Sequence, residues 1–187
     1  MKEKPILFSG PMIRAILANT KTQTRRIFKP DRMTWDANGR YTTYAMRGGE
    51  LSTTGSGPFK PSSWLHYCPY GQPGEDRLYV RETWAAPHAY DHLPPRLIPQ
   101  DARIHYAATE DRGGLLWRPS IHMPRHASRI TLEVTGVRVE TLGVISHEDA
   151  LAEGVSSIEE YKALWINING AWLPETWVWV VDFKGMP

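Results

Sequence analysis

The sequence predicts an α+β fold in one domain that is rich in short strands and carries a few short helices. At 187 residues the chain is long enough to bury one sizeable core. Fifteen proline, fifteen glycine and eight tryptophan residues favour short strands joined by many turns over a helical bundle. Short apolar runs bounded by turn residues recur along the chain, without an internal repeat or a heptad pattern.

Charge and cysteine content narrow the class of protein. The formal net charge of +2 gives no overall field that would demand nucleic acid, so any such binding must come from local basic patches. The single cysteine, Cys68, excludes an internal disulfide framework and suits a reducing compartment, which predicts a cytoplasmic protein. No apolar run approaches the ~20 residues that span a bilayer, so no membrane partner is expected. The sequence does not determine the oligomeric state, and a monomer is favoured.

The N-terminal segment is expected to form a strand and a short helix. Residues 5–8 are an apolar run bounded by proline before and by Ser9 and Gly10 after, as in a strand that enters the core. Ser9 or Gly10 can cap a helix over residues 11–18, and Asn19 is suited to a left-handed stop.

The middle of the chain alternates loop-rich stretches with short strands. Residues 33–70 are filled with Gly, Ser, Thr and Pro and predict an insertion with at most one hairpin. Residues 86–124 are also rich in proline and predict a second insertion, in which residues 104–107 form a brief strand. Between the insertions, residues 77–84 alternate apolar and polar side chains and predict a strand with one buried face.

Two longer strands are expected near the C-terminus. In residues 129–139 the apolar side chains change phase after Gly136, since Val134 belongs to one set and Val137 to the other. This phase change predicts a β-bulge or a sharp bend at Gly136. Residues 177–184 are apolar on both sides and predict a buried strand that closes the domain.

Two helices in series are expected between these strands. Ser146 and Asp149 form a capping-box pattern, and Gly154 is expected to end the helix that they open. Ser156 and Glu159 are expected to open the second helix. The predicted apolar face of this second helix comprises Ile158, Tyr161, Leu164, Trp165 and Ile168.

The most unusual polar stretch is KTQTRR, residues 21–26, directly after the first helix. Such a stretch suits a polar binding site better than a core. Lys21 and Thr24 lie three apart, which on a regular strand places them on opposite faces, so their joint use requires a turn or bulge. A threonine hydroxyl becomes a useful nucleophile beside an amine that is held neutral, and Arg25 and Arg26 are expected to lower the pKa of the lysine.

Glu153 is a second candidate for chemistry. It stands at the end of the predicted helix, before Gly154, where the helix dipole disfavours a carboxylate by ~0.3–1 kcal/mol. An exposed helix end tolerates such a residue, and a lysine amine across a cleft would give it a partner.

Other chemistry has weaker support. His88 with His92 and His122 with His126 have the spacing of metal ligands on a helix, but proline residues surround or divide both pairs, so no metal site is expected. The chain has no Gly-rich phosphate loop and no nucleophile-elbow pattern. The tryptophans that can stack on a base are Trp64, Trp84 and Trp117, although most tryptophans in such a domain are core residues.

The order of these features resembles the ASCH domain family of the PUA-like superfamily. The resemblance rests on KTQTRR, on the strand GEDRLYVRETW, on DALAEG before the helix stop and on the closing WVWVVDFK. It implies a mixed β-barrel with a few short helices, to which residues 33–70 and 86–124 are added. The longer branch that the chain resembles occurs in bacteriophages and prophages.

The resemblance also implies an activity. Small bacterial members of the family are amidohydrolases that remove the acyl group from the exocyclic amine of acylated cytidine, without a cofactor. Lys21 and Thr24 match the family's KTxTxR, Glu153 matches its helix-end glutamate, and Arg26 matches the arginine after the threonine. The expected contacts to the nucleoside substrate are Phe8, Ser9, Arg25, Arg26 and Trp84.

Two mechanisms and two other functions remain open at this point. Thr24 attacks the acyl carbonyl with Lys21 as base, or Glu153 activates a water while Lys21 stabilises the oxyanion. The rival function is an RNA or modified-base binding module, and a single-strand ribonuclease is a third possibility. The binding module predicts a basic strip formed by Arg25, Arg26, Arg118, Arg125 and Arg129.

Overall fold

The computed structural model describes residues 2–28, 68–111 and 113–186, and the backbone of three short strands within residues 32–51. The main sheet has five strands in the order β1-β6-β9-β10-β2. β1 and β6 run parallel and the other neighbours run antiparallel, so the sheet is mixed. The strands are β1 (Lys2–Leu7), β6 (Asp76–Arg81), β9 (Thr131–Thr141), β10 (Trp177–Gly185) and β2 (Gln23–Ile27).

Two smaller sheets accompany it. The first pairs β3 (Arg32–Trp35), β4 (Tyr41–Met46) and β5 (Gly49–Leu51) in that order, so the first predicted insertion contains three paired strands where one hairpin was expected. The second sheet pairs β7 (Trp84–Ala85) with β8 (His105–Tyr106), which confirms the brief strand expected near residue 105. Trp64, one of the candidate stacking residues, lies outside the described residues.

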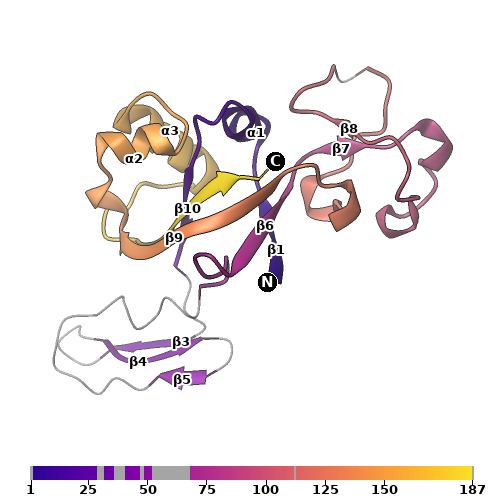
Figure 1. The fold of residues 1–187 in the computed structure, drawn as a ribbon. Helices are drawn as coiled ribbons and strands as arrows, with labels where there is room; N and C mark the ends of the chain where they lie inside the picture. The colour runs from indigo at the N-terminus through magenta and orange to yellow at the C-terminus, as the bar shows by residue number, and fades with distance from the viewer. Residues whose placement is uncertain are drawn as a thin grey trace.

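The helices are few and short, as expected for this fold class. The α-helices are α1 (Gly10–Leu17), α2 (His147–Ala152) and α3 (Ile158–Asn169). The 3₁₀ turns are η2 (His88–Tyr90), η3 (Pro95–Leu97), η4 (Ser120–His122), η5 (Arg125–Ala127) and η6 (Leu142–Val144). In Figure 1, α2 and α3 lie at one end of the main sheet and β7 and β8 at the other. None of the helices in the described residues has both the length and the apolar character needed to span a bilayer.

β10 is buried on both faces, as its sequence predicts. Trp179 and Val181 pack with β1, β6, β9 and α1 in the larger core. Val178 and Val180 point the other way and pack under α2 and α3, with Tyr161 and Trp165. β10 is therefore the element that both cores share.

The local signals near the C-terminus are largely confirmed. The β9–β10 register shifts where Gly136 pairs with Asp182, which is the predicted bulge. The Ser146–Asp149 capping box is present at the start of α2. The second helix differs by one residue, because Ser157, not Ser156, accepts the capping hydrogen bond, from the Glu160 amide.

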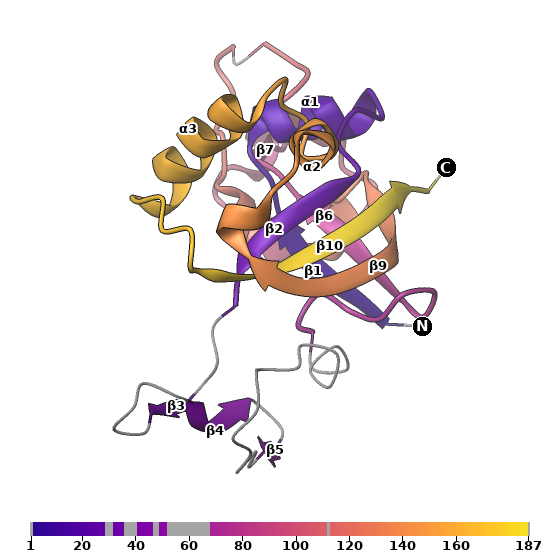
Figure 2. The ribbon, with the colours of Figure 1, turned by 90° about the vertical axis from the view of Figure 1, so that its left-hand side faces the viewer.

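Two expectations are not met: one residue of the predicted helix face is exposed, and the main sheet does not close into a barrel within the described residues. Ile168 is 52% exposed, because α3 is long enough that its last turn passes beyond the core. Within the described residues β1 and β2 end the sheet without pairing, so no closed barrel is found there. The sheet does curl, and Figure 2 shows β2 in front of β1. Arg26 Nη2 bridges the two edges by donating to Leu7 O at 2.6 Å.

Candidate active site

Lys21 and Glu153 meet where two chain segments cross. Lys21 lies just before β2 and forms an isolated antiparallel bridge with Glu153, which follows α2. Gly154 makes this crossing possible, since its φ is +86° and a Cβ there would lie 3.0 Å from Ala15 Cβ and 3.1 Å from Lys21 Cβ. The α2 stop that the sequence predicts at Gly154 is thus also the point where α2 approaches the KTQTRR stretch.

The Lys21 ammonium is fully buried and has three acceptors. Nζ donates to Glu153 Oε2 at 2.7 Å, to Glu153 O at 2.8 Å and to Gln23 O at 2.8 Å. Burial lowers the pKa of Lys21, the Glu153 carboxylate opposes that shift, and the charges of Arg26 and Arg25 lower the pKa further. The predicted effect of the two arginines is confirmed in direction, but burial is the larger cause.

Arg25 lies in a buried network of charged groups. Its Nη2 lies 2.6 Å from Glu140 Oε1 and 3.0 Å from Asp149 Oδ2, and its Nη1 lies 3.5 Å from Glu153 Oε1. With its side chain fully buried among these carboxylates, Arg25 has no exposed donor to offer a substrate. The expectation that the Arg25 side chain contacts the substrate is therefore not met, because pairing neutralises the charge that burial would otherwise penalise.

Arg138 completes this network from β9. Its guanidinium lies 2.9 Å from Asp149, 2.9 Å from Asp182 and 3.2 Å from Glu140. Gln23 links Asp182 back to Arg25 by donating to Asp182 Oδ1 and accepting from Arg25 Nη1. We call these residues the β2 charge network: Lys21, Gln23, Arg25, Arg138, Glu140, Asp149, Glu153 and Asp182. The ion pairs with Lys21 and Arg25 fix the position of the Glu153 carboxylate within this network.

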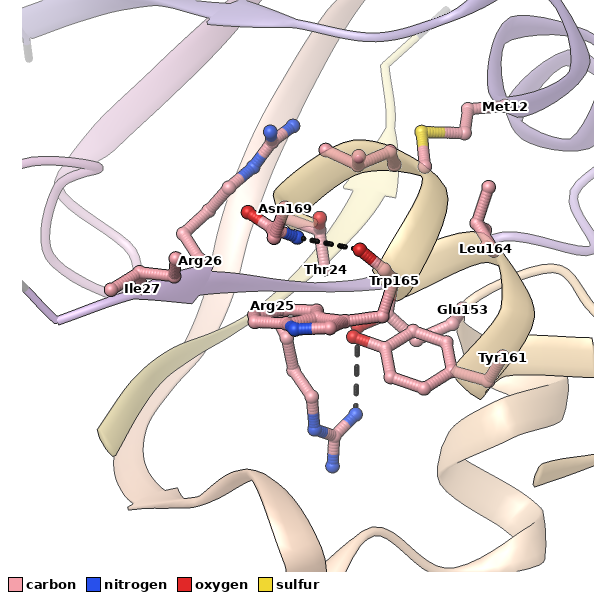
Figure 3. Close-up of a pocket in the computed structure, with 11 residues that line it drawn as sticks. Met12, Thr24, Arg25, Arg26, Ile27, Glu153, Tyr161, Leu164, Trp165 and Asn169 are labelled. Carbon is pink, nitrogen blue, oxygen red and sulfur yellow. Dashed lines mark hydrogen bonds and ion pairs between the residues drawn. The ribbon is translucent and has the colours of Figure 1, made fainter. Parts of the chain in front are cut away.

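Thr24 faces a small pocket between β2 and α3. The pocket has a volume of about 50 Å³. Figure 3 shows its lining, which consists of Met12, Thr24, Arg25, Arg26, Ile27, Glu153, Tyr161, Leu164, Trp165, Ile168 and Asn169. Thr24 is only 2% exposed, and no hydrogen bond among the described residues joins its hydroxyl to Lys21. The structure therefore brings Thr24 and Glu153 to one pocket and leaves Lys21 outside its lining.

The free edge of β2 also faces this pocket. Phe183 N donates to Thr22 O and Phe28 N donates to Trp177 O, so the even-numbered residues of β2 bond to β10. The alternation of an antiparallel pair then turns the peptide groups of Arg25 and Ile27 away from β10. Among the described residues, β10 therefore provides no partner for the main-chain N–H and C=O groups of Arg25 and Ile27.

Tyr161 is a site residue that sequence reasoning assigned only to the core. Its phenol lies beside Glu153 and under the Arg25 guanidinium, whose Cζ is 6.0 Å from the ring centroid. Burial raises the pKa of Tyr161, and the Glu153 carboxylate raises it further, so the phenol keeps its proton. Tyr161 and Trp165 are four residues apart, which is the spacing of an ordinary buried helix face. The sequence pattern therefore gave no sign that Tyr161 lines a pocket.

The other expected substrate contacts are mostly structural. Phe8 is buried, with Arg26 Cζ 5.2 Å and Lys21 Nζ 5.7 Å from its ring centroid, so the ring is not exposed for stacking on a base. Trp84 is fully buried under the Arg118 guanidinium and has no face open for stacking. Ser9 is exposed at the start of α1 and makes no side-chain capping bond. Arg26 lines the pocket as expected.

The arginines of the predicted basic strip are likewise engaged in the fold. Arg118 donates to Tyr90 O and Asp91 O. Arg125 pairs with Glu3, and Arg129 pairs with Glu82. The strip as predicted is therefore not a free cationic surface. Within the described residues no cluster of three or more His, Cys, Asp or Glu side chains could hold a metal ion.

A second hollow adjoins the pocket. It has a volume of about 140 Å³ and shares Met12, Glu153 and Leu164 with the first. Two of the three shared lining residues, Met12 and Leu164, have flexible apolar side chains. Glu153 is the one charged group that lines both.

Comparisons with models of protein families, with curated proteins and with solved structures find no match for this chain. The arguments for its function therefore rest on the residues of the site and their geometry.

Proposed function

We propose that the protein is an ASCH-type amidohydrolase with a PUA-like fold, which removes the acyl group from the exocyclic amine of an acylated cytosine nucleoside or a related nucleobase. One observation carries the proposal: Glu153, which is ion-paired to the buried Lys21 at 2.7 Å, lines the same pocket as the Thr24 hydroxyl. Thr24 and Glu153, which are far apart in the sequence, thus line one small pocket, and Lys21 is ion-paired to Glu153 outside that lining.

The geometry favours Glu153 as the group that moves the proton. Lys21 Nζ donates three hydrogen bonds, two to Glu153 and one to Gln23, and Lys21 does not line the pocket. Its role in this mechanism is therefore to position the Glu153 carboxylate. In this mechanism Glu153 accepts the proton of the nucleophile, which is the Thr24 hydroxyl or a water beside it. The nucleophile's oxygen bonds to the acyl carbon, the carbon–nitrogen bond breaks, and the proton passes to the leaving amine. A water nucleophile gives the free carboxylic acid directly, whereas attack by Thr24 gives an ester that a water then hydrolyses, which releases the acid and restores the hydroxyl.

Two other groups can assist the reaction. The Arg25 N–H, on the free edge of β2, is a candidate donor to the oxyanion that forms at the acyl carbonyl. The protonated Tyr161 phenol lies beside Glu153 and can donate to the leaving amine or steady the carboxylate. The small volume of the pocket favours a short acyl group such as acetyl, with the pyrimidine ring in the adjoining hollow.

The test is a spectrophotometric deacylation assay on acetylcytidine and benzoylcytidine. We expect Thr24→Val and Glu153→Gln to lose about 10²- to 10⁴-fold in kcat if each takes part in proton transfer or attack. Thr22→Val is the matched control, because Thr22 is exposed at the start of the same strand and lines neither hollow. Full activity in both site variants would disprove the proposed roles.

A second candidate, a modified-base binding module without chemistry, is favoured by a different observation. Lys21 Nζ donates to three acceptors and so links the start of β2 to the end of α2. An ion pair with a purely structural role would make the same contacts. Folded wild-type protein that binds acetylcytidine but does not release acetate would support this candidate.

A further inference from the structure

A groove that shares no lining residue with the Thr24 pocket lies beside β6. Its volume is about 430 Å³, and its lining is Arg81, Pro94, Pro95, Arg96, His122, Met123 and Pro124. We call it the β6 groove. Three of these side chains are basic and none is acidic, so the groove is suited to an anionic ligand.

Arg81 is held in place without a neutralising partner. Its Nη1 donates to Ile121 O at 3.2 Å, and its Cζ lies 5.5 Å from the centroid of the Tyr79 ring. Its Nε is buried and has no hydrogen-bond partner in the part of the chain that the structure describes. Within the described residues neither Arg81 nor Arg96 pairs with a carboxylate, whereas the nearby Arg125 pairs with Glu3. A fixed guanidinium with unused donors is the usual means of binding phosphate oxygens.

The groove and the Thr24 pocket lie on either side of the end of β1. Arg26, which lines the pocket, donates to Leu7 O at 2.6 Å. Leu7 is the register partner of Arg81 in the parallel β1–β6 pair. One strand, 40% exposed at Leu7, therefore separates the two basic side chains, and Figure 1 shows β1 and β6 side by side.

We infer that the β6 groove binds the phosphates of a single-stranded nucleic acid whose modified base enters the pocket between β2 and α3. Arg26, which donates to Leu7 O, and Arg81, the register partner of Leu7, supply one basic side chain each along the way from the pocket to the groove. Three prolines form a stiff apolar wall on which sugars and bases can lie. This inference rests on the proposed function for what the pocket holds, but the binding of the strand is independent of turnover.

The test measures binding, not turnover. A fluorescein-labelled single-stranded cytidine oligonucleotide is titrated by anisotropy at several salt concentrations with wild type, Arg81→Gln, Arg96→Gln and the double variant. We expect each single variant to raise Kd about threefold or more at low salt. The slope of log Kd against log salt should fall by about 0.7 for each phosphate contact that is lost. Arg103→Gln, an exposed arginine outside the groove lining, is the matched control and should leave both values unchanged.

Competing ligands decide what the groove recognises. Cytidine monophosphate should compete much more weakly than the oligonucleotide, and polyglutamate should not compete at equal charge. Equal competition by either ligand, or an unchanged Kd and slope in the double variant, would overturn the inference. Turnover of acetylcytidine by the wild type, together with oligonucleotide binding that the arginine variants leave unchanged, would disprove this inference alone. Normal binding of the oligonucleotide by a protein that does not deacylate acetylcytidine would disprove the proposed hydrolase activity alone.

Discussion

The β2 charge network and the β6 groove both contain arginines, and they differ in what balances the charge. In the network, Arg25 and Arg138 each lie within 3.2 Å of at least two carboxylates. In the groove, Arg81 and Arg96 have no carboxylate partner among the described residues. A cation that folding buries must be paired by the fold, whereas a cation at the rim of a groove can keep its donors for a ligand.

This comparison separates residues that hold the site from residues that contact a ligand. The network orients Glu153 and leaves its arginines unavailable, although Arg25 is part of the most conspicuous basic stretch in the sequence. The groove has no such stretch, because Arg81, Arg96 and His122 are far apart in the chain. Clustering in sequence is therefore a poor guide to which cations are free.

The largest expected effect is on stability, at Lys21. Lys21→Met keeps the volume but leaves the buried Glu153 carboxylate with only a longer ion pair, to Arg25 at 3.5 Å, among the described residues. We expect a loss of roughly 3–5 kcal/mol in the free energy of unfolding, measured by urea denaturation. Because Lys21 and Glu153 form a buried ion pair at 2.7 Å, Lys21→Ala is also expected to destabilise the fold.

Two controls sharpen that prediction. Lys184→Met removes a 63% exposed lysine from its pair with Glu133 and should cost at most about 1 kcal/mol. The double variant Lys21→Met with Glu153→Leu should recover much of the stability, because neither charge is then left alone. A double variant as unstable as the single one would show that the ion pair is not the reason for the loss.

Asp149 is expected to have an intermediate effect on the stability of the fold at acidic pH. Burial works to raise the pKa of Asp149, but hydrogen bonds from Ser146 and the charge of Arg25 prevail and hold it below its ordinary value. A lowered pKa means that Asp149 stabilises the fold above its unfolded pKa of about 3.9, and that this contribution is lost as pH falls through the lower folded value.

Asp149→Asn should therefore flatten the fall in stability below about pH 4, measured as thermal midpoints across a pH series. Asp111→Asn, at an exposed position, serves as the comparison and should leave the profile unchanged. A profile of Asp149→Asn that matches wild type would contradict the role of the network in acid stability.

The smallest expected effect is on the stability of a groove variant. Arg96→Gln removes an exposed charge without a partner in the described structure, so the free energy of unfolding should change by no more than about 0.5 kcal/mol. The same urea measurement tests it. A loss as large as that of Lys21→Met would break the comparison, because the groove would then be part of the fold and not a surface left for a ligand.

Several parts of the fold could be predicted from local signals. The Gly136 bulge follows from the phase of neighbouring side chains, and the Ser146 cap follows from spacing within one turn. The left-handed Asn19 is confirmed by its φ of 56°. These features depend on residues close in sequence, whose geometry the backbone itself constrains.

The errors have one cause in common. Trp84, Arg25 and Ile168 were assigned from residue type and spacing, but their exposure is decided by elements far away in the chain. Tyr161 was read as core, and it is buried, yet its position beside Glu153 depends on how α3 packs over β2. Residue type predicts what a side chain can do, and packing decides whether anything can reach it.

The sequence by itself determined the α+β class, the strands near residues 5, 78, 132 and 180, and the candidate set Lys21, Thr24 and Glu153. Only the tertiary structure decided that Lys21 is enclosed by three acceptors and that Thr24 and Glu153 share a pocket. It also decided that no carboxylate among the described residues pairs with Arg81 or Arg96. The physical reason is that hydrophobic periodicity and turn chemistry act over a few residues, whereas burial and charge pairing depend on long-range contacts.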